Sequence, residues 1–356
     1  MSSESVDARR ERIAQFDFRE LAPFVRFGTA SDRYAGWIGQ IYPEAEYATR
    51  TRGRNRKLGG KTFREEQVPI DSVRHYFEHF EVLELDFTFY RPLLEADGTP
   101  GNNLGVLREY ADNAPEHARF LLKAPQTYFV RKLRRGSPPV WEPNPDYLNA
   151  EACNAHFIDP AIRVLGSRLE GFIFEQSYVK QSESPSPEGN VAELAEFFGA
   201  LDRRVQAHLE LRSSHLLVDA YFDWLAAEGL GFVFSHWSWL PPIREQWAMC
   251  GKRFSAANER VVARLLTPLR MSYADAYALS HPFDKPAEKL EGSRGTHRMV
   301  MDATALAYQG LLQGHTVDLI LNNRAYGNSP MLGQLIAGKI LDEEVRRFVE
   351  GSGGAL

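Results

Sequence analysis

FEVLELDFTFYR, residues 80–91, is the stretch that decides the fold. Apolar and polar side chains alternate along it with a period of two, which is typical of a β-strand with two different faces. One face carries Val82, Glu84, Asp86 and Thr88, and the other carries Leu83, Leu85, Phe87 and Phe89. An ionised carboxylate is costly to bury without a partner. The face with Glu84 and Asp86 is therefore expected to line a hydrated cavity or to meet cations from neighbouring strands.

Eight segments with strand-like patterns alternate with helix-like segments along the chain. The expected strands span residues 24–29, 80–91, 119–124, 169–176, 207–212, 230–236, 264–270 and 317–323. Apolar residues at three- and four-residue spacing predict helices over 71–79, 190–201, 219–228 and 302–312. This alternation predicts an α/β fold, a TIM-type (β/α)8 barrel with chemistry at the carboxyl ends of its strands. A doubly wound open sheet is the alternative, but its phosphate-binding GxGxxG motif is absent.

The composition limits the class of protein. The chain has 356 residues, 44% of them hydrophobic, and a formal net charge of −5, which argues against general coating of nucleic acid. It has only two cysteines, Cys153 and Cys250, and no apolar run long enough to span a membrane. We therefore expect a cytoplasmic protein without disulfides or membrane contact. We expect one barrel domain over residues 21–345, an N-terminal extension over 1–20 and a flexible tail over 346–356.

Two basic stretches look like insertions in the loops that follow strands. Residues 47–66 are rich in Arg, Lys and Gly, and residues 131–147 combine a basic run with several prolines. Because both follow predicted strands, both are expected at the catalytic end of the barrel. Residues 181–190 are expected to form another loop there.

Short motifs near several predicted strand ends resemble those of the YecE-like family, the domain of unknown function seventy-two. In chain order they are Gly28-Thr29, Trp37 with Tyr42-Pro43, Glu84-x-Asp86-x-Thr88-Phe89-Tyr90, Lys123-Ala124, Glu210-x-Arg212, and Asn322-Asn323 with Gly327 and Pro330. The resemblance extends over nearly the whole chain between residues 24 and 340. It implies a TIM barrel and supplies no established reaction.

The sequence departs from this family pattern at several strand ends. Ser31-Asp32 replaces Gly-Trp, Glu175 replaces Gln, Ser177-Tyr178 replaces two prolines, and Ser272-Tyr273 after Arg270 replaces His-Gly. With the basic insertions, these departures indicate a divergent member, so an activity of typical members is not carried over to this chain.

Polar residues at the strand ends converge in one mouth if the barrel closes. The candidate catalytic acid/base groups are Glu210, Glu175 and Asp86, and the candidate substrate-binding residues are Arg212, Arg270, Lys123, Asn322, Asn323, Thr88, Tyr90 and His236. Arginine binds phosphate or carboxylate through two parallel hydrogen bonds, and amides orient a substrate oxygen. We expect a hydrolase or another acid/base enzyme acting on a small anionic substrate. The alternative for Glu84 and Arg212 is an ion-paired plug that fixes the barrel and does no chemistry.

No cofactor is predicted. Residues 75–79 match the inverted zinc-peptidase pattern HxxEH, but their helix leads into the second strand, so its end lies at the barrel's amino-terminal end. Only His236 stands at a predicted strand end, too few histidines for a multi-metal phosphodiesterase site. A single Mg²⁺ or Mn²⁺ held by carboxylates is the metal site that the sequence allows.

Nucleic acid is the alternative partner. The basic residues of 50–64 are Arg50, Arg52, Arg54, Arg56, Lys57, Lys61 and Arg64, and those of 131–135 are Arg131, Lys132, Arg134 and Arg135. Basic side chains near aromatic ones such as Tyr34 and Trp141 suit phosphate backbones and unstacked bases. A solvated insertion that binds nothing is the commoner outcome for such runs.

Overall fold

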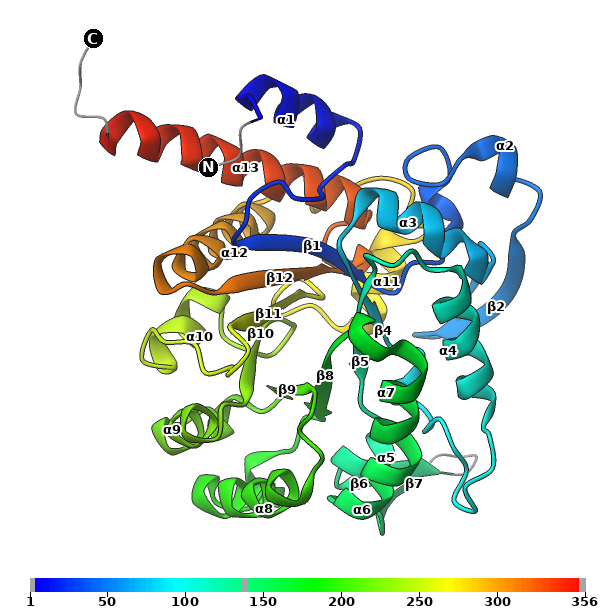
Figure 1. Ribbon diagram of the computed structural model, residues 1–356, viewed down its shortest axis with the longest axis vertical. Helices are drawn as coiled ribbons and strands as arrows, with labels where there is room; N and C mark the ends of the chain where they lie inside the picture. The colour runs from blue at the N-terminus through cyan, green and yellow to red at the C-terminus, as the bar shows by residue number, and fades with distance from the viewer. Residues whose placement is uncertain (1–3, 136–139, 352–356) are drawn as a thin grey trace.

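A closed barrel of eight parallel strands forms the centre of the protein (Figure 1). The computed structural model describes residues 4–135 and 140–351. Around the barrel the strands follow the order β1-β12-β11-β10-β9-β8-β5-β4. Their bounds are β1 (Val25–Ala30), β4 (Val82–Leu85), β5 (Arg119–Lys123), β8 (Leu169–Gln176), β9 (Gln206–Leu211), β10 (Gly231–His236), β11 (Arg260–Leu265) and β12 (Thr316–Leu321). The closed ring confirms the predicted TIM-type fold and excludes the open sheet.

Helices surround the ring and cover its outer, apolar face (Figure 1). The longer ones are α4 (Asn102–Asn113), α8 (Pro187–Ala200), α9 (Asp219–Glu228), α12 (Arg294–Gln313) and α13 (Ser329–Gly351). The shorter ones are α1 (Val6–Ala14), α2 (Glu44–Tyr47), α3 (Val73–His79), α5 (Gln126–Phe129), α6 (Ala150–Cys153), α7 (Asp159–Leu165), α10 (Ile243–Met249) and α11 (Tyr273–Ser280). Helix α9 has the predicted bounds. Helix α12 begins earlier than predicted because Ser293 caps it, its hydroxyl accepting from the Thr296 N–H.

Inward-facing side chains fill the barrel in three layers. The middle layer is mainly apolar, with Ala30, Val82, Leu121, Ile173, Val233, Val262 and Ile320, and β9 adds the buried imidazole of His208 beside Ile173. Toward the amino ends of the strands, Arg26 binds Asp318 at 2.7 Å and Glu170 at 3.3 Å. Toward the carboxyl ends lies a second charged layer. Strand β1 approaches β4 so closely that a Cβ at Gly28 would lie 2.2 Å from the Val82 carbonyl oxygen, which explains this glycine.

Two predicted strands differ from the observed ones by more than two residues at one or both ends. Strand β4 ends at Leu85, and a 3₁₀ turn over Phe87–Phe89 follows, so Asp86 and Thr88 do not continue the inward face of the strand. The seventh strand is Arg260–Leu265 and not 264–270, so that prediction was wrong. Its inward positions are Val262 and Arg264, while Arg270 lies in the following loop with a φ of 62°. Pro268, which cannot donate a ladder hydrogen bond, lies between the strand and Arg270.

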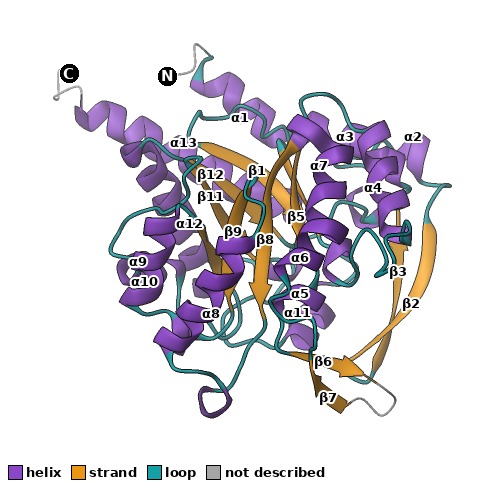
Figure 2. Cartoon of the chain, turned by 60° about the horizontal axis from the view of Figure 1, so that its bottom comes forward, coloured by secondary structure: helices purple, strands orange, loops and turns teal. Residues whose placement is uncertain are grey.

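Each basic insertion contains a two-stranded antiparallel hairpin. The first pairs β2 (Arg52–Leu58) with β3 (Lys61–Gln67), and the second pairs β6 (Lys132–Arg135) with β7 (Val140–Pro143). In Figure 2 the β6–β7 hairpin lies below the carboxyl end of β8, and the β2–β3 hairpin runs along the right-hand side of the molecule toward the same end. Residues 136–139 of the second insertion lie outside the described residues. In the stretch 181–190, a short 3₁₀ turn over Gln181–Glu183 precedes α8.

The two terminal helices lie side by side at the opposite end of the barrel (Figures 1 and 2). An ion pair joins Arg9 of α1 to Glu344 of α13 at 2.8 Å, so most of the predicted N-terminal extension packs on the domain. Helix α13 continues to Gly351, and the rest of the predicted tail lies outside the described residues. Within residues 4–135 and 140–351, no helix has the length and apolarity needed to cross a membrane.

Candidate functional site

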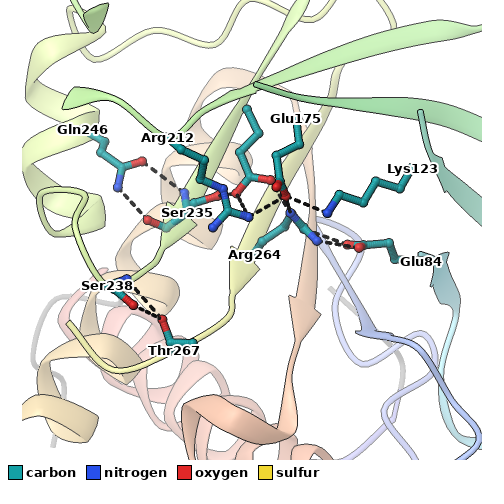
Figure 3. Close-up of polar contacts among 10 residues, drawn as sticks. Glu84, Lys123, Glu175, Arg212, Ser235, Ser238, Gln246, Arg264 and Thr267 are labelled. Atoms are coloured by element: carbon teal, nitrogen blue, oxygen red, sulfur yellow. Dashed lines mark hydrogen bonds and ion pairs between the residues drawn. The ribbon is translucent and has the colours of Figure 1, made fainter. Parts of the chain in front are cut away.

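Six charged side chains meet inside the carboxyl end of the barrel (Figure 3). They come from five strands or strand ends and are Glu84, Lys123, Glu175, Glu210, Arg212 and Arg264. We call them the charge cluster. Five of the six were predicted from the sequence to face the barrel interior, and Arg264 was not.

Arg264 lies at the centre of the charge cluster. Its Nε is 2.7 Å from Glu84 Oε2 and its Nη2 is 2.5 Å from Glu84 Oε1, so the guanidinium binds this carboxylate through two parallel hydrogen bonds. Its Nη1 donates to Glu210 and lies 3.4 Å from Glu175 Oε2. Sequence reasoning gave this position to Arg270. The period-two pattern from Val262 to Arg264 is the signal that could have placed the strand correctly.

Glu175 is shared by the remaining cations. Its Oε2 lies 2.7 Å from Lys123 Nζ and 2.7 Å from Arg212 Nη2. Burial alone would raise the pKa of Glu175, but the charges of Arg212, Lys123 and Arg264 outweigh burial and hold the pKa well below its ordinary value. Glu175 is therefore ionised at neutral pH and has no proton to give as a general acid.

Glu210 is fully enclosed. Its side chain is 0% exposed and accepts from the Ser235 hydroxyl, from Arg264 and from Arg212 Nη2 at 3.1 Å. Three carboxylates and three cations thus balance one another inside the ring. This is the arrangement that the ion-paired plug requires, although Lys123, Arg212 and Glu175 keep side-chain exposures of 10%, 7% and 13%.

Two further predicted residues hold loops in place. The buried Thr88 hydroxyl donates to the Lys123 carbonyl at 2.6 Å. The side-chain oxygen of Asn323 accepts from Trp37 Nε1 at 3.2 Å and from the Ser329 N–H at 2.7 Å. Both amino acids therefore have partners within the protein that a substrate would have to displace.

A cavity of about 710 Å³ opens beside the charge cluster, between the hairpin β2–β3, the loops after β1 and β4, and helix α11. We call it the hairpin cavity. Three of the predicted site residues, Asp86, Tyr90 and Asn322, line it. Side chains that the sequence did not single out as site residues also line it, among them Phe87, Tyr273, Tyr277 and Arg324.

Two arginines of the hairpin cavity contact the same tyrosine. The guanidinium carbon of Arg324 lies 4.4 Å from the centre of the Tyr273 ring, and Arg56 Nη2 donates to the Tyr273 hydroxyl at 2.9 Å. Arg56 also binds Glu65 at 3.0 Å. The Nε of Arg324, by contrast, is buried without a hydrogen-bond partner among the described residues.

Asp86 has no hydrogen bond or ion pair from its side chain to another described residue, although it is partly buried in the cavity wall. Its charge acts on its surroundings. After burial, which is the larger cause, Asp86 is the next contributor that raises the pKa of the Tyr90 phenol. Asp86 is thus a carboxylate at a cavity surface whose oxygens are available to a ligand.

Asp32 is a buried carboxyl that sequence reasoning noted only as a departure from the family pattern. It is 0% exposed, its Oδ1 accepts from the Tyr110 hydroxyl at 2.7 Å, and its Oδ2 has no partner among the described residues. Burial raises the pKa of Asp32 to about 6, and the nearby charge of Asp86 adds to the rise. Its position two residues after β1, at a barrel strand end, is the signal that could have found it.

His236 and Arg270 line a different cavity of about 890 Å³, between α10, the loop after β11 and the first turn of α12. We call it the α12 cavity. Among residues 4–135 and 140–351, none lines both cavities. The single mouth expected from the sequence is therefore divided into two cavities.

Histidines of the HxxEH pattern have partners of their own. His75 contacts Glu46 at 3.1 Å and Glu78 at 3.3 Å, and His79 contacts the Phe16 carbonyl. In the part of the chain that the structure describes, no group of three or more His, Cys, Asp or Glu residues is arranged to hold a metal ion.

Comparison with known families matches residues 54–345 to the model described as "Protein of unknown function DUF72". The chain belongs to the DUF72 family. YecE-like is another name for this family, so the resemblance seen in the sequence is confirmed. No functionally curated protein matches the chain.

Solved DUF72 structures share the fold. A DUF72 family protein from Thermotoga maritima MSB8 is 15% identical, with a TM-score of 0.51 over 90% of this chain and 99% of that chain. One from Enterococcus faecalis V583 is 13% identical, with a TM-score of 0.51 over 90% and 98% of the two chains. At these identities the likeness concerns the fold alone.

Proposed function

We propose that this DUF72 protein is an acid/base enzyme, a hydrolase in the first instance, that acts on a small anionic substrate bound in the hairpin cavity. Asp86 exchanges a proton with the substrate, and Arg324 and Arg56 bind its anionic group. The proposal is carried by one observation: Asp86 has no side-chain partner among the described residues and Arg324 has a buried, unpartnered Nε, both at the wall of one cavity. Buried polar atoms without partners are costly, and an anionic ligand would supply the partner for Arg324.

The charge cluster has a supporting role in this proposal. Glu175 and Glu210 are each bound by two or more cations. The pKa of Glu175 is held low, so Glu175 has no proton to give, and Glu210 is fully enclosed and cannot reach a ligand. Lys123 and Arg212 are likewise bound to Glu175. The cluster fixes the strand ends from which the loops of the hairpin cavity start, and the proton-transfer role passes to Asp86, supported by the buried carboxyl of Asp32.

The walls of the hairpin cavity indicate the shape of the substrate. Tyr34, Phe87 and Tyr273 provide aromatic surface beside the two arginines. A planar or apolar ring next to an anionic group suits such walls. Ser31 and Tyr273, two positions where the sequence departs from the YecE-like pattern, line this cavity. We therefore expect a substrate different from that of typical family members.

The test is a thermal-shift screen of anionic metabolites with the full-length protein, with and without Mg²⁺ or Mn²⁺, because a ligand of the native state raises its melting temperature. The samples with Mg²⁺ or Mn²⁺ test whether Asp86 and the substrate together bind a single divalent ion. Hits are then assayed for turnover with Asp86→Asn. We expect kcat to fall by at least about 10²-fold, because a general acid/base contributes roughly this much.

The matched control is Asp112→Asn, which neutralises an exposed aspartate on α4 outside the hairpin cavity. It should leave turnover unchanged. Unchanged turnover in Asp86→Asn, with normal folding, would rule out the catalytic role of this carboxylate.

Nucleic acid is a second candidate ligand, favoured by three exposed or partly exposed basic side chains of the β2–β3 hairpin. Arg52, Lys57 and Lys61 have no ion-pair partner among the described residues, whereas Arg54 and Arg56 both bind Glu65. Binding of a fluorescent single-stranded oligonucleotide should weaken steeply as the salt concentration rises. Replacing the three residues by Ala should reduce the slope of the logarithm of the binding constant against the logarithm of salt concentration by about two to three. A slope that does not change would remove this candidate.

A further inference from the structure

The α12 cavity combines several features of an anion-binding site. It lies between the loop after β10, the loop after β11 and the first turn of α12. With a volume of about 890 Å³, it is large enough for a small organic ligand. Helices α10 and α12, which contribute to it, lie on the same side of the barrel (Figure 1).

The amino end of α12 faces this cavity. The helix has 20 residues, and Ser293 caps it by accepting from the Thr296 N–H at 3.1 Å. Gly295, in the first turn, lines the cavity and has no side chain to cover its backbone N–H. Free N–H groups and the helix dipole together favour an anion at such a position.

An independent observation points to a ligand at the same place. His236, the last residue of β10, lines the cavity, is only 4% exposed, and has a buried Nδ1 without a partner among the described residues. Its neighbour Ser235 points into the barrel and donates to Glu210, so His236 lies on the opposite face of the strand. A buried imidazole nitrogen without a hydrogen bond is rare, and a ligand oxygen would satisfy it.

The charges around the cavity also favour an anion. Arg270 and Arg298 line it, are exposed, and have no ion pair with another described residue. Arg244 is paired with Asp302 at 3.4 Å, which leaves Glu245 as the remaining acidic group of the lining. Apolar side chains, among them Trp239 and Met299, form the rest of the wall.

We propose that the α12 cavity is a second binding site, for a ligand that carries a phosphoryl or carboxylate group on a small apolar body. The ring of His236 and the N–H groups at the start of α12 bind the anionic oxygens. Arg270 and Arg298 bind the same group from the rim. This site does not depend on the proposed reaction, because none of the described residues that line it also lines the hairpin cavity.

The experiment titrates the full-length protein calorimetrically with three probes, inorganic phosphate, phenyl phosphate and benzoate, at an ionic strength held constant with NaCl. We expect saturable binding, tighter for phenyl phosphate than for phosphate because the phenyl ring contacts the apolar wall. Comparing phenyl phosphate with benzoate tells which oxyanion the site prefers. Absence of saturable binding for all three probes would refute the proposal. Equal affinities for inorganic phosphate and phenyl phosphate would refute the claim that the ligand carries an apolar body.

Variants locate the binding. His236→Leu and Arg298→Ala should each weaken phenyl phosphate binding by about tenfold or more, since each removes a hydrogen bond to a charged group. His236→Gln, which keeps an N–H donor, should lose less than His236→Leu. Wild-type affinity in both His236→Leu and Arg298→Ala would refute the assignment. If His236→Leu fails to fold, the surface variant Arg298→Ala decides.

Two control variants separate binding in the α12 cavity from binding elsewhere on the protein. Arg108→Ala removes an exposed arginine on α4, on the other side of the barrel, and should leave affinity unchanged (Figure 1). Arg324→Ala alters the hairpin cavity, so it should remove only phenyl phosphate binding at that cavity and leave intact the binding that His236→Leu and Arg298→Ala weaken. Loss of phenyl phosphate binding in Arg324→Ala alone would place the probe in the hairpin cavity and refute the second site.

Discussion

The charge cluster and the hairpin cavity lie at the same end of the barrel but differ in how their charges are paired. In the cluster, three carboxylates and three cations are bound to one another and almost fully enclosed. In the cavity, Asp86 and the Nε of Arg324 have no partner among the described residues. Removing one partner of a buried ion pair is costly, because the other charge is left buried without a partner. Unpaired charges at a cavity wall, by contrast, remain available for a ligand. Location at the strand ends alone does not distinguish the two.

The largest effect on stability is expected from Arg264→Leu. This change leaves Glu84 and Glu210 buried without their central cation, which should lower the free energy of unfolding by about 3–5 kcal/mol. Urea denaturation at pH 7 measures it. The matched control Arg108→Ala should change the free energy of unfolding by less than about 0.5 kcal/mol. A cost for Arg264→Leu as small as that of the control would show that the cluster is not a stabilising plug.

A smaller effect, dependent on pH, is expected from Asp32→Asn. Because the folded-state pKa of Asp32 is raised from 3.8 to about 6, the protonated form fits the native state, and stability is lost as pH rises through this range. The neutral amide avoids that loss, so Asp32→Asn should exceed the wild type by roughly 2–3 kcal/mol at pH 8 and match it near pH 4.

Urea denaturation at the two pH values tests this expectation. Glu175 provides an internal contrast, because its lowered pKa makes its stabilising effect disappear as pH falls below 4.5 rather than as pH rises. If the difference in unfolding free energy between Asp32→Asn and the wild type is the same at pH 4 and pH 8, the pKa of Asp32 is not raised in the folded protein.

The smallest effect on stability is expected from Arg324→Ala. Its partly exposed guanidinium loses only its contact with the Tyr273 ring, which is worth about 0.5–1 kcal/mol. The same change should abolish the thermal shift given by anionic ligands of the hairpin cavity. A variant with a full ligand-induced shift would show that Arg324 does not bind the substrate.

Much of the fold could be predicted from the sequence, because the period-two strands and the helices between them are local patterns. The seventh strand was misplaced because RVVARLLTPLR contains two overlapping apolar runs, and apolar content alone does not fix the phase of the alternation. That error moved the central cation from Arg264 to Arg270. Of the predicted cations, Lys123 and Arg212 do lie beside the inward glutamates, whereas Arg270 lines the α12 cavity.

The two cavities could not be predicted, because they depend on contacts between distant segments. Arg56 meets Tyr273 across 217 residues of sequence, and that contact exists only because the β2–β3 hairpin lies beside α11. Asp86 was found because the period-two pattern of residues 80–91 put it on the polar face, although β4 itself ends at Leu85. Arg324 was missed because it lies beyond the end of β12, where the sequence analysis assigned substrate binding to Asn322 and Asn323 instead.

The apolar middle layer of the barrel has a consequence for proton movement. Seven hydrocarbon side chains lie between the charge cluster and the Arg26–Asp318 pair near the other end. Such side chains offer water no hydrogen-bonding positions, and the polar group that β9 adds at this level is the buried imidazole of His208, beside Ile173. Neither ring nitrogen of His208 has a hydrogen-bond partner among the described residues, so no hydrogen-bonded path for protons joins the two charged layers through it.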